Sequence, residues 1–130
     1  MDALLIRQPW IDKIFARKKT WEIRSRSTEK RGRIALVESG TGSVVGVADL
    51  IDVHGPLTLK DYIAKASTAG LSAAEAREGL PYSRTYAWVL KRAKRLAQPV
   101  SYRHPQGAVI WVRLAPNVEK AIEHQLRERP

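Results

Sequence analysis

The chain has 130 residues, of which 44% are hydrophobic and 28% charged, and its formal net charge is +10. This length and balance are ordinary for one globular domain, which we place over residues 1–130. There is no cysteine, which excludes disulfides and thiolate metal sites. No apolar run approaches the roughly 20 residues of a membrane span, and no secretory signal is apparent, so we expect a cytoplasmic protein without membrane contact.

The first half of the chain alternates between strand and helix patterns. Strands are predicted over residues 3–7, 20–24, 33–38 and 43–53. A turn joins the last two strands at residues 39–42, and Gly46 is a candidate β-bulge. A helix is predicted between the first two strands, because Pro9 suits a first helical turn. An apolar stripe follows Pro9 at helical spacing, made of Trp10, Ile11, Ile14 and Phe15.

Two short helices with capping signals are predicted in the second half. Thr58 caps the first helix and Gly70 ends it, while Ser72 and Glu75 form the capping box of the second. The remaining elements are a strand over 86–90, an extended segment over 98–102, a strand over 108–114 and a terminal polar helix over 118–129. This pattern predicts an α+β fold: a small mixed β-barrel surrounded by α-helices, with its core over about residues 3–114.

The positive charge is unevenly distributed along the chain. Residues 1–33 carry ten Lys and Arg against four acidic residues, and residues 79–118 carry seven against none. The segment between them is mildly acidic, with three Lys and Arg against six acidic residues. If the two basic blocks meet in space they form a positive surface, for which phosphate is the obvious partner.

Three segments, taken in order, resemble the ASCH domain family of the PUA-like superfamily. They are Leu5–Trp10 (LIRQPW), Lys19–Arg24 (KTWEIR), which is close to the family's GxKxxExR signature, and Tyr102–Trp111 (YRHPQGAVIW). The likeness covers about residues 3–114. One departure is that Arg17 or Lys18 stands where the signature has glycine, which we expect to change how the preceding helix ends.

The resemblance implies a PUA-like barrel with a cleft between barrel and helices that binds RNA. Some relatives are understood to act as ribonucleases, and a compact subgroup as amidohydrolases on acylated cytidine. In that subgroup a lysine acts as base and a threonine as nucleophile, at the positions of Lys19 and Glu22 here. A glutamate in place of the threonine argues against the same covalent route in this chain.

The strand over 20–24 carries the central candidate residues. Its alternation puts Thr20, Glu22 and Arg24 on one side, while the apolar residues between them pack the other. Glu22 and Arg24 can pair, or they can bind a base edge, with the carboxylate accepting from an exocyclic amine and the guanidinium donating. Lys19, at the mouth of the strand, is expected to supply a mobile cation for a phosphate.

Further nucleic-acid contacts are expected from several segments. Arg7 and Gln8 lie at a strand-to-helix turn, Ser39 lies in a glycine-rich turn, and Arg26 lies in a polar loop. Tyrosines in an acid-free segment can stack on bases, and the basic run after it can contact the RNA backbone. These candidates are Tyr82, Tyr86, Lys91, Arg92 and Arg95, to which His104 and Gln106 add a loop near the last strand. Trp10 is assigned to the core.

The first hypothesis for function is a module that binds single-stranded RNA or a nucleotide in a basic cleft. Lys19, Glu22 and Arg24 form the floor, and Arg7, Lys91 and Arg95 line the walls. The second is a ribonuclease in which Lys19, Glu22 and His104 divide the proton transfers and phosphate stabilisation. The third is an amidohydrolase acting on N4-acylated cytidine. No cofactor or dedicated metal site is expected, although a loosely bound Mg²⁺ is compatible with each hypothesis.

Overall fold

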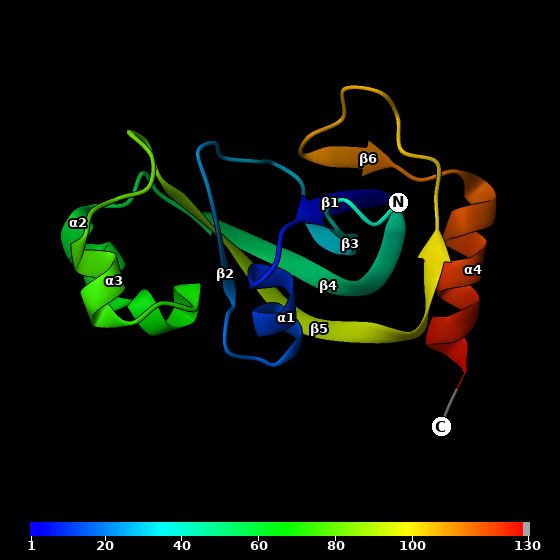
Figure 1. Ribbon diagram of the computed structural model, residues 1–130, viewed down its shortest axis with the longest axis horizontal. Helices are drawn as coiled ribbons and strands as arrows, with labels where there is room; N and C mark the ends of the chain where they lie inside the picture. Colours follow the sequence, from blue (N-terminus) through cyan, green and yellow to red (C-terminus); the bar gives the residue numbers. More distant parts are fainter. Residues whose placement is uncertain (129–130) are drawn as a thin grey trace.

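Six strands form one curled, half-barrel sheet in the computed structural model, which describes residues 1–128 (Figure 1). The strands are β1 (Asp2–Ile6), β2 (Trp21–Arg24), β3 (Gly32–Glu38), β4 (Ser43–His54), β5 (Tyr86–Ser101) and β6 (Trp111–Arg113). Their order across the sheet is β2-β5-β4-β3-β1-β6. The sheet is mixed, because β1 runs parallel to β3 while the other pairs are antiparallel. The predicted α+β architecture, a small mixed sheet with helices around it, is confirmed.

The helices lie around this sheet in three places. They are α1 (Trp10–Phe15), α2 (Leu59–Ala64), α3 (Ala73–Arg77) and α4 (Pro116–Arg127), with a 3₁₀ turn, η1, at Ala66–Ala69. Figure 1 shows α2 and α3 together at one end of the sheet, α1 beside β2 and β5, and α4 along the final part of β5 at the other end. In the described residues 1–128, no helix combines the length and apolarity needed to cross a membrane.

Strand alternation divides the core into two clusters on opposite faces of the sheet. Leu4 and Ile6 of β1 pack with Ile11 and Ile14 of α1. Ala3 and Leu5 face the other way, toward a cluster that includes Val118 and Ile122 of α4. A third, smaller cluster joins α2, η1 and α3 to the outer side chains of β2. The predicted apolar stripes therefore become the surfaces that hold the helices on the sheet.

The short helices begin at the residues that the sequence indicates, but the helix predicted between Thr58 and Gly70 divides into α2, which ends at Ala64, and η1. The Thr58 hydroxyl accepts a hydrogen bond from the backbone N–H of Asp61, and Ser72 with Glu75 forms a complete capping box. Gly70 has a φ of 78° and ends η1 in the left-handed conformation. These starts and stops were predictable because each depends on contacts within four residues along the chain.

Gly46 lies where α1 approaches the sheet most closely. A Cβ atom built at Gly46 would lie within 2.5 Å of the Phe15 ring and of the Lys94 carbonyl oxygen. The pairing of β4 with β5 also shifts register between Val44 and Gly46, which confirms the predicted irregularity. A side chain at this position would push α1 off the sheet.

The second half of the sheet differs from the sequence prediction in three ways. The basic run does not interrupt the strand, because β5 continues through it, paired with β4, while the charged side chains face solvent. The predicted strand over 108–114 shortens to β6, since β1 offers partners only from Asp2 to Leu4. The terminal helix begins earlier, at Pro116, and ends at Arg127; residue 129, assigned to it from sequence, lies outside the described residues.

Candidate functional site

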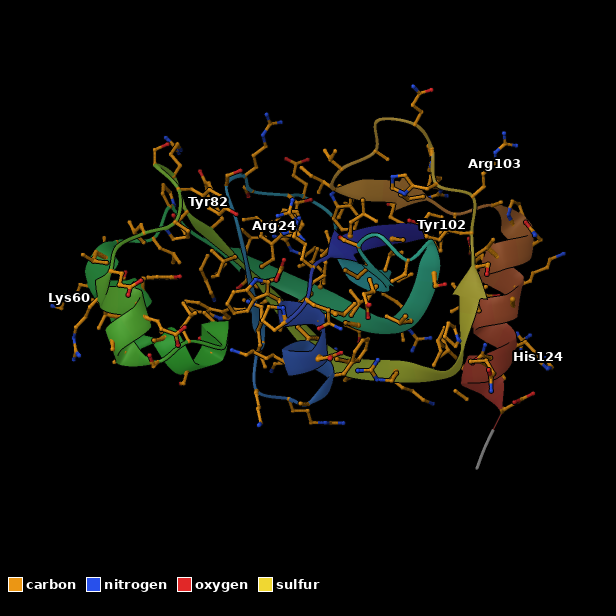
Figure 2. The ribbon with its side chains drawn as sticks, in the orientation of Figure 1. Arg24, Lys60, Tyr82, Tyr102, Arg103 and His124 are labelled. Carbon is orange, nitrogen blue, oxygen red and sulfur yellow. The ribbon has the colours of Figure 1, made fainter. Side chains whose placement is uncertain are left out.

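A cleft of about 480 Å³ opens where the end of β1, the start of α1 and β2 meet the segments around α2 and α3. Figure 2 shows two of its side chains, Arg24 and Tyr82, on the same side of the molecule, between the sheet and the α2–α3 end. The residues that line it are Leu5, Arg7, Trp10, Lys19, Glu22, Ile23, Arg24, Ser39, Tyr62, Ala69, Leu71, Pro81, Tyr82 and Val109.

Glu22 is held between two cations on the floor of the cleft. Its Oε2 accepts from Arg24 Nε at 2.9 Å and lies 2.7 Å from Arg24 Nη2, while its Oε1 lies 3.5 Å from Lys19 Nζ. The side chain of Glu22 is only 8% exposed. Strand alternation predicts the pairing of Glu22 with Arg24, and the structure adds Lys19 as a second partner for the same carboxylate.

Lys19 is buried rather than mobile. Its ammonium group donates to the backbone carbonyls of Trp21 and Ala69 and lies 5.1 Å from the centre of the Trp10 ring. Burial lowers the pKa of Lys19, and the neighbouring Glu22 carboxylate opposes that shift. The expectation of a flexible phosphate-binding cation is therefore wrong for the position of this side chain, because η1 packs over it and supplies one of its carbonyl partners.

Arg24 is fixed on three sides. Besides the two contacts with Glu22, its Nη2 donates to the Leu5 carbonyl at 2.7 Å, which ties β2 to the end of β1. Its guanidinium also lies 5.7 Å from the centre of the Trp88 ring. Such a clamp presents the Glu22–Arg24 pair to the cleft in one geometry, and this pre-organisation favours ligand binding.

Aromatic and apolar side chains form the walls above this charged floor. The ammonium groups of Lys13 and Lys19 lie 5.0 and 5.1 Å from the centre of the Trp10 ring. Tyr62 is buried, and burial raises the pKa of its hydroxyl. Tyr82 is 43% exposed and Val109 is 76% exposed, so these two lining residues are open to solvent.

Several lining residues were not identified from sequence. The sequence predicts Trp10 and Tyr62 in apolar helix stripes and Val109 in a strand, and no pattern marks Leu71 or Pro81 as part of a site. A helical stripe predicts which way a side chain points, but not whether that side chain lies in the core or borders a cavity. Here that depends on how η1 and the 80–85 segment pack against the helices. The one local signal available was that Trp10 lies two residues after Gln8, at the same strand-to-helix turn as Arg7 and Gln8.

The structure brings six of the fifteen predicted site residues to the cleft. They are Arg7, Lys19, Glu22, Arg24, Ser39 and Tyr82. Gln8 instead donates to Glu38, and the Arg26 carbonyl accepts from the Trp88 indole. Tyr86 accepts from Arg84 at its hydroxyl. These three residues and Gln106, in an exposed loop, lie outside the lining.

The basic run of β5 does not line this cleft, contrary to the expectation for Lys91 and Arg95. Lys91, Arg92 and Thr20 line a separate hollow, and Arg95 pairs with Asp12 and lies over the Phe15 ring. Thr20 and Glu22, predicted to share one side of β2, therefore line different hollows. Thr20 precedes β2 and its N–H donates to the carbonyl of Thr68, which removes it from the alternation of the strand.

His104 is held in its own loop. Its Nδ1 lies 2.8 Å from the Tyr102 hydroxyl and its Nε2 lies 2.9 Å from the Ala108 carbonyl oxygen. The grouping of Lys19, Glu22 and His104 expected for a ribonuclease is therefore not formed. In residues 1–128 no cluster of three His, Asp or Glu side chains suited to a metal ion occurs.

Comparison with known proteins gives a consistent picture of the fold. The family model described as "ASCH domain" matches residues 4–100. A crystal structure of ASCH from Zymomonas mobilis is similar, with a TM-score of 0.71 and 18% identity over 95% of this chain and 93% of that one. Structures of two point variants of the Zymomonas protein give TM-scores of 0.70 and 0.69, each at 17% identity, over 95% of this chain and 96% and 94% of theirs. No curated protein matches.

Proposed function

Since the chain belongs to the ASCH domain family, whose members are generally thought to bind RNA, we propose that its cleft binds an unpaired nucleotide of single-stranded RNA. Proteins that bind RNA by sequence take up unstacked bases, pack them on aromatic rings and hydrogen-bond their edges. The cleft offers both kinds of contact, because aromatic walls stand above a fixed carboxylate and guanidinium.

The observation that carries the proposal is the Lys19–Glu22–Arg24 row at the floor of an open cleft, in which Lys19 and Glu22 are buried and Arg24 is half-buried. Burying ionised side chains costs free energy, so such a row is weak support for stability alone. In an open cleft the same groups meet a ligand with their orientation already fixed. The volume of about 480 Å³ is within the usual range for small-molecule sites and suits one nucleotide rather than a duplex.

Arg7 and Tyr82 complete the proposed contacts at the rim. Arg7 is exposed and lines the cleft beside the floor, where it can pair with a phosphate. Tyr82 is exposed enough to stack on a base without leaving a core position. The net charge of +10 favours association with a polyanion and makes binding sensitive to salt.

Binding of a fluorescent 12-nucleotide single-stranded RNA of mixed sequence tests the proposal. Tyr82→Ala should weaken binding about tenfold, since stacking of one base contributes roughly 1–3 kcal/mol. Leu59→Ala is the matched control, because Leu59 is 41% exposed on α2 and does not line the cleft. We propose that no cofactor is needed, so EDTA should leave the affinity unchanged. Equal affinities for wild type and Tyr82→Ala would contradict the proposal.

A hydrolytic activity at the same site is a second candidate, favoured by one observation. Lys19 has a lowered pKa and faces a carboxylate in a cleft, a combination that suits proton transfer. Labelled RNA and N4-acylated cytidine, each incubated with the purified protein with and without Mg²⁺, are the two substrates to assay. Release of products that is lost in Lys19→Met, but retained in Lys60→Met, would support this candidate. Intact substrates would eliminate it.

A further inference from the structure

A second hollow, of about 660 Å³, lies beside the loop that follows α1 and the basic part of β5. Its lining holds five cations and no acidic residue: Arg17, Lys19, Lys91, Arg92 and Lys94, together with Ile14, Thr20, Leu90 and Ala93. Lys19 is the one residue, within the described part of the chain, that lines both this hollow and the cleft. The two basic blocks of the sequence therefore do meet in space, but here rather than at the cleft.

Most of this charge has no partner in the protein. The side chains of Arg17, Lys91 and Lys94 are exposed and form no ion pair or hydrogen bond with residues 1–128. Arg92 pairs with Asp49, and Lys19 pairs with Glu22 on its cleft side. Three clustered cations without a counter-charge repel one another, and they attract a polyanion to the hollow.

Two of these arginines occupy backbone positions that normally favour glycine. Arg17 has a φ of 62° and Arg92 a φ of 53°, and within residues 1–128 no other non-glycine residue has a positive φ. The left-handed conformation costs free energy for a residue with a side chain. Both exceptions line the same hollow. Strain of this kind is concentrated at functional sites, where a side chain is needed in a particular place.

The backbone at Arg17 forms a type of helix ending that favours glycine. Arg17 N–H donates to the Ile14 carbonyl and Lys18 N–H to the Lys13 carbonyl, which is the Schellman ending of a helix. Arg17 holds the left-handed position of that motif, which glycine usually occupies.

Arg92 holds a left-handed position as well, at an irregularity in strand β5. Between the pairs Asp49–Lys91 and Val47–Lys94, β5 has one residue more than β4, which makes a β-bulge. The bulge turns Lys91 and Lys94 out of strict alternation, so that both line the hollow.

From this arrangement we infer that the hollow binds the phosphodiester backbone of the RNA strand whose unpaired nucleotide lies in the cleft, a reading that rests on the proposed function. Because Lys19 lines both spaces, the hollow adjoins the cleft, and a strand that continues from the cleft into the hollow would meet Arg17 and the two lysines of β5 there. These contacts neutralise phosphates without touching bases, so they add affinity for every sequence alike.

Salt-dependent binding of a 12-nucleotide and a 3-nucleotide single-stranded RNA tests this inference. In Lys91→Gln/Lys94→Gln the slope of log affinity against log salt for the 12-mer should become shallower by about 1.4, since each contact with a single strand contributes about 0.7. At 0.1 M salt this loss corresponds to about 25-fold weaker binding. The 3-mer, which places one nucleotide in the cleft and carries few phosphates beyond it, should bind as it does to wild type. Lys60→Gln/Lys120→Gln removes the same charge from α2 and α4 and should leave the slope unchanged.

Arg17→Gly separates binding from folding. Glycine relieves the left-handed strain, so the melting temperature should stay the same or rise, while binding of the 12-mer weakens about fivefold. A variant that is at least as stable as wild type and binds the 12-mer equally well would overturn the role of Arg17.

The outcomes distinguish this inference from the proposed function. If the lysine double variant leaves the 12-mer slope unchanged while Tyr82→Ala still weakens both probes, the hollow is not on the RNA path and the cleft proposal stands. If Tyr82→Ala has no effect while the double variant lowers the slope, the hollow binds backbone and the cleft proposal fails. If inorganic pyrophosphate binds wild type but not the double variant, and 12-mer binding is the same for both, the hollow is a small-anion site and the inference is overturned.

Discussion

Lys19 and Glu22 face each other at the floor of the cleft, with Nζ 3.5 Å from Oε1 and with 3% and 8% of their side chains exposed. Glu22 has a second cationic partner in Arg24, whereas Lys19 has Glu22 as its one carboxylate partner among the described residues. Removing one member of such a group changes both the stability of the fold and the chemistry of the cleft.

Glu22→Gln should lower the free energy of unfolding by about 3 kcal/mol, because it leaves the Lys19 ammonium buried without a counter-charge. Urea denaturation at neutral pH measures this loss. Glu29→Gln is the control, since Glu29 is exposed and its replacement should change stability by no more than about 0.5 kcal/mol. A loss below about 1 kcal/mol for Glu22→Gln would show that the pair does not hold the buried lysine.

The same burial gives stability a defined pH dependence. The pKa of Lys19 is lower in the folded protein than its ordinary value of 10.5. At a pH between the folded value and 10.5, Lys19 is therefore protonated in the unfolded chain but deprotonated in the folded protein. The contribution of Lys19 to stability therefore rises with pH across this window and is constant below it.

Comparing wild type with Lys19→Met isolates the contribution of Lys19 to the pH dependence of stability, because methionine does not titrate. From neutral pH toward 10.5, wild type should gain stability relative to Lys19→Met in urea denaturation. A pH-independent difference between the two proteins, or a relative loss for wild type, would contradict the predicted direction of the shift.

Gly46→Ala should destabilise the fold by about 2 kcal/mol, since the new methyl group would overlap the Phe15 ring and the Lys94 carbonyl. Thermal unfolding measures the change. Gly40→Ala is the comparison, because Gly40 has a φ of 85° and open space around it, so its cost of about 1 kcal/mol is backbone strain alone. If Gly46→Ala costs no more than Gly40→Ala, the close approach of α1 is not needed for stability.

His104→Ala should leave RNA affinity, and any hydrolysis at the cleft, within about twofold of wild type. The reason is that both ring nitrogens are engaged by Tyr102 and Ala108 outside the cleft. Loss of these two bonds should cost about 1 kcal/mol of stability. A loss of activity beyond tenfold in the folded variant would place His104 at the site after all.

Local sequence determined much of this structure. The helix starts at Thr58 and Ser72, the end at Gly70 and the alternation of β1 and β2 all depend on neighbours a few residues away. The Glu22–Arg24 pair follows from the same alternation, because residues two apart on a strand lie on one face. These features were predictable without knowing what packs against them.

The path of the basic run was not predictable in this way. Lys91 and Arg95 are near neighbours in sequence, yet Lys91 lines the second hollow while Arg95 pairs with Asp12 of α1. Their directions depend on a bulge in β5, and that bulge is set by pairing with β4. The burial of Lys19 likewise depends on η1, whose Ala69 carbonyl lies 50 positions away in sequence.

By itself, the sequence determined the family, the helix starts and the Glu22–Arg24 pair of β2, because each rests on residue order and short-range geometry. The tertiary structure decided that Trp10, Tyr62 and Tyr82 line one cleft, and that the two basic blocks meet in a second hollow beside Lys19. Cavities arise where elements distant in sequence fail to fill the space between them. Their position is therefore a property of packing among all the elements, which no local pattern encodes.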